Sequence, residues 1–120
     1  MPSSDKDFFL KAAAFLGASG VGLGAIGAHA FKKTLIQYGT KESWTTATVY
    51  QLLHATALLG FAAHDKISPL AGKLLTCGTV MFSGSIYCFS LNIGPKAILG
   101  PTTPIGGMLM IGGWAVAGIS

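Results

Sequence analysis

The sequence predicts an all-α protein: an integral membrane bundle of four helices that forms a single domain over residues 1–120. One observation is the distribution of charge, because residues 12–31, 43–64, 74–95 and 97–120 contain no Lys, Arg, Asp or Glu. Each interval reaches the length of about 20 predominantly apolar residues that a helix needs to cross a membrane core. The other observation is composition: 51% of the residues are hydrophobic and 10% are charged, whereas soluble domains carry about 25% charged residues.

The glycines predict how these helices pack. The chain has 17 of them, and in a water-exposed helix each costs about 1 kcal/mol relative to alanine. In a membrane the backbone must satisfy its own hydrogen bonds, so the helix persists, and helices associate where small residues let their backbones approach. We therefore expect helix-packing positions at Gly20, Gly24, Gly27, Ala28, Gly84, Gly106, Gly107 and Gly113.

The first helix is expected over about residues 8–30, followed by an amphipathic link over residues 31–42 that lies on the membrane surface. Lys32 and Lys33 are expected at the lipid headgroups. Trp44 is expected beside them as an interfacial anchor.

Two other interpretations of the first apolar segment are rejected. Residues 22–27 (GLGAIG) match the dinucleotide-binding pattern G-x-G-x-x-G, but that pattern requires a preceding strand and a following helix start. Residues 28–30 (AHA) are similar to a signal-peptide cleavage site. The preceding apolar run is longer than the usual 7–15 residues, however, and the segment before it has no net positive charge.

The second helix is expected over about residues 40–64, with Thr40 as its N-cap. The third is expected over about residues 69–91, because a serine followed by a proline at residues 68 and 69 is a helix-start signal. The link between these two helices is short, which predicts an antiparallel hairpin.

The fourth helix is expected over about residues 104–119, because Thr103 and Pro104 repeat the same cap-and-proline signal. It is therefore predicted to be short, or to follow a segment that dips into the membrane.

Three polar side chains of the second helix form the core of a candidate intramembrane site. Tyr50, Gln51 and His54 are three or four residues apart, which places them on one helix face. His54 lies near the middle of its span, where an ionisable residue suggests a functional site. The alternative is that the three side chains bond to neighbouring helices as neutral groups. His29, at the end of the first helix, is the fourth candidate residue.

A metal site, a cofactor and an enzymatic activity are not expected. Zinc needs three or four ligands, whereas His29 and His54 should differ in membrane depth by roughly 10 Å. Cys77 and Cys88 are eleven residues apart in one helix, which is too far for a disulfide. The four spans contain no carboxylate, and no C-x-x-C, G-x-S-x-G or H-E-x-x-H motif occurs.

The net charge of +4 suggests anionic lipids, such as cardiolipin, as partners. No nucleic-acid partner is expected, because the chain has no arginine. The positive-inside rule does not decide orientation, since each predicted side carries four lysines: Lys6, Lys11, Lys66 and Lys73 on one, and Lys32, Lys33, Lys41 and Lys96 on the other.

Four stretches carry a family resemblance: GAIGAHAFKK, WTTATVYQLLHATALL, FSGSIYCFSL and TPIGGMLMIGGW. In this order they resemble the transmembrane protein 256 family, small four-helix membrane proteins of bacterial inner membranes and eukaryotes. The resemblance implies the fold and a membrane location, and it implies no reaction. Its motif residues also include Ser83, Tyr87 and Trp114 here.

Three functional hypotheses follow. The leading one is a structural or accessory subunit that packs against other membrane-protein subunits, in a mitochondrial respiratory-chain assembly of the inner membrane. This location rests on the resemblance, and a bacterial inner membrane is the alternative. The second is a small transporter or channel whose path is lined by Tyr50, Gln51 and His54. The third is a membrane enzyme or lipid-handling protein that uses His29 and His54.

Overall fold

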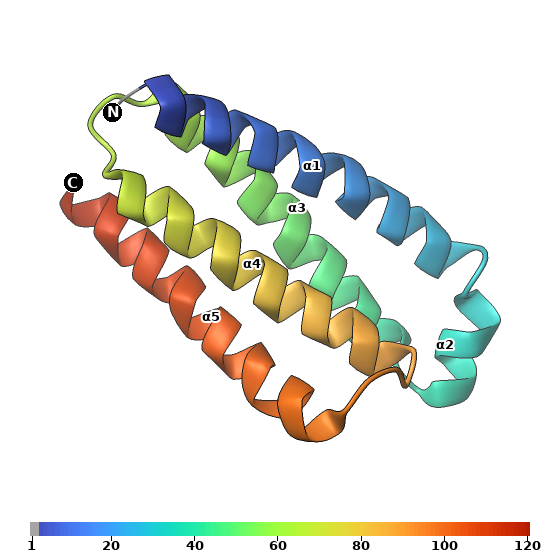
Figure 1. Cartoon of the computed structure of the whole chain (residues 1–120). Coiled ribbons are helices and arrows are strands. Elements are labelled where there is room, and N and C mark those ends of the chain that lie inside the picture. Colours follow the sequence, from blue (N-terminus) through green and yellow to red (C-terminus); the bar gives the residue numbers. More distant parts are fainter. Residues whose placement is uncertain (1–2) are drawn as a thin grey trace.

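The structure is a computed structural model that describes residues 3–120, and that part of the chain is helical without strands. Figure 1 shows that the long helices run side by side, with a short helix at one end of the molecule. They are α1 (Ser3–Ala28), α2 (Lys32–Tyr38), α3 (Lys41–Ala63), α4 (Pro69–Ser90) and α5 (Lys96–Ile119). The all-α prediction is confirmed. Residues 3–120 contain five helices rather than four, because part of the predicted link is itself helical.

The four long helices pack in a definite order. Helix α1 packs on α3, α3 on α4, and α4 on α5, with only slight contact between α1 and α4. The start of α1 and the end of α5 lie at the same end of the molecule (Figure 1). The backbone N–H of Ser68 donates to Ser120 Oγ at 3.0 Å, which joins the α3–α4 turn to the end of α5 at that end. Helices α3 and α4 form the predicted antiparallel hairpin.

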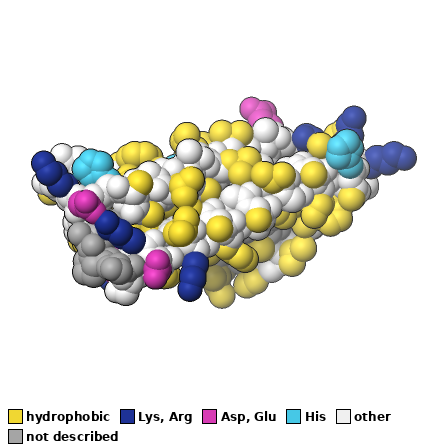
Figure 2. Space-filling view, turned by 90° about the horizontal axis from the view of Figure 1, so that it is seen from above, with side chains coloured by type: hydrophobic (Ala, Val, Ile, Leu, Met, Phe, Trp, Pro, Cys, Tyr) yellow, Lys and Arg dark blue, Asp and Glu magenta, His cyan; other side chains and the backbone are white. Residues whose placement is uncertain are grey.

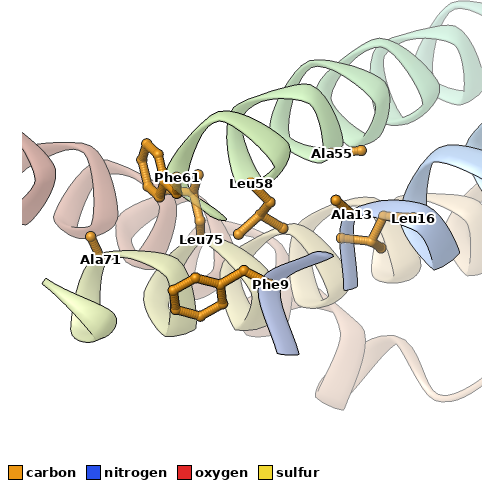
Figure 3. Packing of buried hydrophobic residues seen from close by; sticks show 8 residues of the cluster. All are labelled: Phe9, Ala13, Leu16, Ala55, Leu58, Phe61, Ala71 and Leu75. Atoms are coloured by element: carbon orange, nitrogen blue, oxygen red, sulfur yellow. The ribbon is translucent and has the colours of Figure 1, made fainter. Parts of the chain in front are cut away.

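The apolar core lies where α1, α3 and α4 meet. Figure 3 shows Phe9 of α1, Leu58 of α3 and Leu75 of α4 close to one another in this core. Gly72 makes room for the Phe9 ring, because a Cβ there would lie 2.3 Å from Phe9 Cζ. The complete cluster is Phe9, Ala13, Leu16, Ala55, Leu58, Phe61, Ala71 and Leu75.

The two expected caps at the starts of α3 and α4 differ. Ser68 caps α4 as predicted, since its Oγ accepts from the Leu70 N–H at 3.3 Å and Pro69 follows at the first helical position. Thr40 occupies the N-cap position of α3, but its side chain makes no cap bond. Its Oγ1 instead donates to the Ser90 carbonyl oxygen at 2.7 Å. The prediction that Thr40 caps α3 is therefore wrong, because this hydroxyl ties the start of α3 to the end of α4.

The predicted start of the last helix at residue 104 is also wrong. Helix α5 begins at Lys96 and contains both Pro101 and Pro104. Each proline removes one helical N–H donor, but the helix continues through this segment. Thr102 Oγ1 donates to the Ile98 carbonyl oxygen at 2.7 Å, and Thr103 Oγ1 to that of Leu99 at 3.4 Å. The threonine that was predicted as a cap, Thr103, thus lies inside the last helix.

The short helix α2 confirms that the link is amphipathic. Leu35 is fully buried against the bundle, whereas Ile36, Tyr38 and the preceding Phe31 are exposed. Gly39 ends the helix in the left-handed conformation at φ 70°, which glycine adopts without the penalty of a Cβ. Lys32 and Lys33 are exposed in its first turn.

The surface of the molecule is strongly apolar. Figure 2 shows hydrophobic side chains along most of one face, with most charged side chains towards its two ends. Among the described residues, α1 and α5 are the two helices that are long and apolar enough to cross a membrane by length and composition. Four such spans were predicted. Helix α3 falls short because it carries polar side chains, among them Thr48, Gln51 and His54, which are buried in the bundle.

Candidate functional site

Gln51 is the centre of a buried hydrogen-bond network between α1, α3 and α4. Its Nε2 donates to the Leu16 carbonyl oxygen at 2.9 Å and to Ser19 Oγ at 2.8 Å. Its Oε1 accepts from the Tyr87 hydroxyl at 2.7 Å. Ser19 in turn donates to the Phe15 carbonyl oxygen at 2.7 Å. Gln51 is 4% exposed, so this amide links three helices while its own polar atoms are satisfied.

His54 lies on a different side of α3, towards α5. The Trp114 indole Nε1–H donates to His54 Nε2 at 3.1 Å, so Nε2 carries no proton. His54 Nδ1 lies 2.8 Å from the Tyr50 carbonyl oxygen, and because a carbonyl can only accept, Nδ1 is the protonated nitrogen. The ring is therefore neutral, and both nitrogens are bonded within the chain.

Tyr50 lines a groove rather than the bundle interior. Its ring stacks on the His54 ring with centroids 6.2 Å apart and an interplanar angle of 12°. The centroids of the Tyr50 and Phe82 rings are 4.9 Å apart. The side chain of Tyr50 is 41% exposed. With Trp114 of α5, these residues line a lateral groove of about 550 Å³ between α3 and α5.

A second, smaller groove opens between α1 and α4. Its volume is about 200 Å³, and Gln51, Ser19 and Tyr87 are among its lining residues. Ser83, which also lines it, donates to the Ala47 carbonyl oxygen at 2.7 Å. The predicted shared face of Tyr50, Gln51 and His54 is thus divided, since Gln51 lies at this groove and the other two lie at the α3–α5 groove.

His29 is not part of either groove. It lies in the exposed turn between α1 and α2. Among residues 3–120, no group of three or more His, Cys, Asp or Glu side chains is placed to hold a metal ion. Cys77 and Cys88 are both free thiols.

Trp44 is buried rather than interfacial, so its prediction as a headgroup anchor is wrong. It is 2% exposed, and its indole Nε1–H donates to the Leu23 carbonyl oxygen at 2.8 Å. Gly27 creates the space for it, because a Cβ at this position would lie 2.2 Å from Trp44 Nε1. A glycine of α1 therefore makes room for a large side chain of α3. The position of Trp44 near a helix end did not indicate that this side chain is buried.

Most of the predicted packing glycines make close contacts. An added Cβ would lie 2.7 Å from Leu52 Cδ2 at Gly20, 3.1 Å from Thr48 Cγ2 at Gly24, and 2.4 Å from Leu75 Cδ1 at Gly113. At Gly106 it would lie 2.5 Å from the Phe82 backbone nitrogen.

Three predicted packing positions differ. A Cβ at Gly84 would meet no atom within 4 Å, and one at Gly107 would make an ordinary contact at 3.8 Å. Ala28 is exposed at the end of α1. These residues follow the same small-residue spacing, but they face away from the helix contacts.

The partners of Gln51 and His54 were not among the predicted site residues. Tyr87, Ser19 and Trp114 come from three other helices. Tyr87 and Trp114 belong to the quoted family motifs, which is the sequence feature that could have marked them as site residues.

Comparison with known proteins identifies the family. A family model described as "Protein of unknown function (DUF423)" matches residues 23–107, which is more than half of the chain. The chain belongs to this family. It is 41% identical over 110 residues to the UPF0382 membrane protein C1782.12c of Schizosaccharomyces pombe, covering 86% of this chain and 92% of that protein. No solved structure matches it.

Bacterial members of the DUF423 family are equally similar. The chain is 39% identical over 116 residues to the UPF0382 inner membrane protein YgdD of Escherichia coli, covering 91% of this chain and 85% of that protein. It is 41% identical over 100 residues to a UPF0382 membrane protein of Staphylococcus epidermidis, covering 80% of each. The chain is thus a membrane protein of a family found in bacteria and yeast. The transmembrane protein 256 family is a related family of small membrane proteins.

Proposed function

We propose that this chain is a four-span membrane bundle that acts as a structural subunit of a larger membrane assembly. In this proposal α1, α3, α4 and α5 all cross the membrane, and α2 lies at one surface. The exposed apolar sides of α1 and α5 face lipid or neighbouring subunits. The proposal assigns the chain no reaction.

The observation that carries the proposal is the internal bonding of two polar side chains of α3, Gln51 and His54. His54 is neutral with both nitrogens bonded, and Gln51 joins three helices through its amide. Polar side chains used in this way hold helices together in lipid. In this bonding arrangement neither Gln51 nor His54 carries a charge.

The alternative of a transporter or channel has less support. A path lined by Tyr50, Gln51 and His54 would require the three side chains to face one space, whereas they are divided between two grooves. A membrane enzyme that uses His29 and His54 has less support still, because one is in an exposed turn and the other is buried in α3.

Lipid partners and the host membrane are part of the proposal. Lys32 and Lys33 are exposed beside apolar side chains of α2, a combination that suits anionic headgroups such as those of cardiolipin. We propose an inner membrane as the location, which agrees with the name of the Escherichia coli relative, the inner membrane protein YgdD. A mitochondrial membrane and a respiratory-chain assembly stay predictions.

The test is the native size of the protein after extraction in a mild detergent, with mass spectrometry of the proteins that migrate with it. We expect migration within a complex much larger than the 12.3 kDa chain. Respiratory subunits in that band would support the narrower prediction. Migration as a monomer or small homo-oligomer would contradict the structural role, and flux through liposomes would then become the assay.

The variant His54→Ala separates a structural role from a chemical one. If His54 is structural, the amount of assembled complex should fall in proportion to the amount of the protein. Loss of a cellular phenotype at normal abundance would instead favour transport or chemistry. Thr56→Ala is the matched control, because Thr56 is exposed on the same helix and donates to the Leu52 carbonyl oxygen at 3.0 Å.

A further inference from the structure

The groove between α3 and α5 has the size and lining of a binding site for a small apolar molecule. Its volume of about 550 Å³ is within the range of about 300–1,000 Å³ typical of ligand pockets. Three aromatic side chains, Tyr50, Phe82 and Trp114, and the His54 ring contribute flat surfaces to it. Met108 adds a flexible side chain, which can adapt to an irregular ligand.

The chemistry of the lining restricts the ligand. No Lys, Arg, Asp or Glu lines the groove, so a charged ligand would find no counter-charge there. The His54 ring is neutral, and the Trp114 indole N–H is already used by it. The groove therefore suits a neutral molecule whose surface is mostly apolar.

The Tyr50 hydroxyl can donate a hydrogen bond to a ligand, and an acyl chain has no atom that could accept it. It has no hydrogen-bond partner among residues 3–120, although it lines the groove and is partly exposed. Tyr50 lies about 14 Å along α3 from Lys41, which is close to the middle of a membrane core about 30 Å thick. An unpaired hydroxyl at that depth has no water to bond, which is unfavourable.

We propose that the groove binds a neutral, membrane-soluble ring compound that carries a carbonyl oxygen, with the Tyr50 hydroxyl donating to that oxygen. The ring lies among Tyr50, Phe82 and Trp114. Alkyl-benzoquinones are the simplest molecules of this class. The inference rests on the four-span placement proposed above, and it requires no partner subunit.

The experiment uses the full chain in phosphatidylcholine nanodiscs and decylubiquinone as the probe. Binding is followed by quenching of tryptophan fluorescence, because Trp114 lines the groove whereas Trp44 is buried beneath α1. We expect saturable quenching by the wild type. Tyr50→Phe should bind about ten-fold more weakly, because it removes only the donor hydroxyl.

Two glycine variants form a matched pair. Gly107→Leu should abolish saturable quenching by filling the groove, since a Cβ there meets its nearest atom at 3.8 Å and the backbone need not move. Gly84→Leu, in the opposite groove where a Cβ meets no atom within 4 Å, should bind as the wild type does. Circular dichroism and thermal unfolding verify that both variants fold. If Gly107→Leu does not fold, the affinity of Tyr50→Phe alone tests the proposal.

Three results would overturn the proposal. They are the absence of saturable quenching in the wild type, equal affinity of Tyr50→Phe and the wild type, and displacement of the probe by 1-decanol, which has the same ten-carbon tail and no ring. Because binding is measured on the isolated chain, a negative result would leave the structural-subunit proposal standing.

Discussion

The pair α1–α3 and the pair α4–α5 are both closed by glycines, but in different ways. In α1 the glycines receive side chains: Trp44 lies against Gly27 and Leu52 against Gly20. In α4–α5 the glycines bring backbones together, since a Cβ at Gly106 would lie 2.5 Å from the Phe82 nitrogen and one at Gly78 2.7 Å from the Gly106 carbonyl oxygen.

The two helix pairs also differ in the side-chain hydrogen bonds that join them. The α1–α3 pair is joined by side-chain donors, with the Trp44 indole and the Gln51 amide bonding to carbonyl oxygens of α1. Between α4 and α5 the side-chain bond is that of Ser85 with Thr103. Close backbone approach and polar bonding are thus alternative means of holding helices together where lipid supplies no hydrophobic driving force.

The largest effect is expected where backbone meets backbone. Gly106→Ala should lower the free energy of unfolding by about 3 kcal/mol, because the backbone of α4 cannot yield as a side chain can. Gly107→Ala, one residue along, should change it by less than about 0.5 kcal/mol. Thermal unfolding in a mild detergent measures both. Equal midpoints for the two variants would remove the basis of the comparison.

A smaller effect is expected from the polar network. Gln51→Leu removes the bonds to Leu16, Ser19 and Tyr87 and should cost about 2 kcal/mol. Gln37→Leu makes the same change at an exposed position of α2 and should leave stability almost unchanged. If both variants have the same unfolding midpoint as the wild type, the network does not hold α1 to the bundle.

The contact between α3 and α5 can be isolated by a double-mutant cycle. His54→Phe, Trp114→Phe and the double variant should give a coupling energy of about 1 kcal/mol, the size of one side-chain hydrogen bond in a membrane. Unfolding in detergent provides the four free energies. Additive effects would mean that the indole and the imidazole do not bond in the folded protein.

The smallest effect is expected at the exposed end of the molecule. Lys6 donates to Asp65 and forms an ion pair with it, and this ammonium group lowers the pKa of Asp65 from its usual value of 3.8. Because the folded-state pKa is the lower one, the stabilisation is present above pH 3.8 and is lost as the pH falls below that value.

Thermal unfolding of the wild type and of Asp65→Asn at pH 7 and pH 3 tests this interaction. The small difference between the two proteins at pH 7 should shrink at pH 3. A difference that grows at low pH would contradict the assigned direction.

Much of the fold could be predicted from the sequence. Each uncharged interval overlaps one of the long helices, because charged side chains lie near the starts of these helices or in the links between them. The start of α5 was predicted wrongly from Pro101 and Pro104, which are typical helix breakers, although the uncharged interval 97–120 begins directly after its observed first residue, Lys96. Helix α5 nevertheless continues through both prolines, and the local sequence alone does not indicate this.

The candidate site was predicted only in part. Gln51 and His54 are three residues apart, which leaves them about 60° apart around α3, and this is enough to direct them to different neighbouring helices. Their partners Tyr87, Ser19 and Trp114 depend on the packing order of α1, α4 and α5. Helix spacing within one segment does not determine that order.

We propose that α3 and α4 cross the membrane together with α1 and α5, although among the described residues it is α1 and α5 that are long and apolar enough to do so by length and composition. Single cysteines at positions 37, 66 and 120, in a chain with Cys77 and Cys88 replaced by serine, test it directly through labelling with a membrane-impermeant maleimide. Four spans predict that residue 66 is labelled from the same side as residue 120 and from the side opposite residue 37. Labelling of residue 66 from the same side as residue 37 would mean that α3 and α4 do not span, and it would contradict the account.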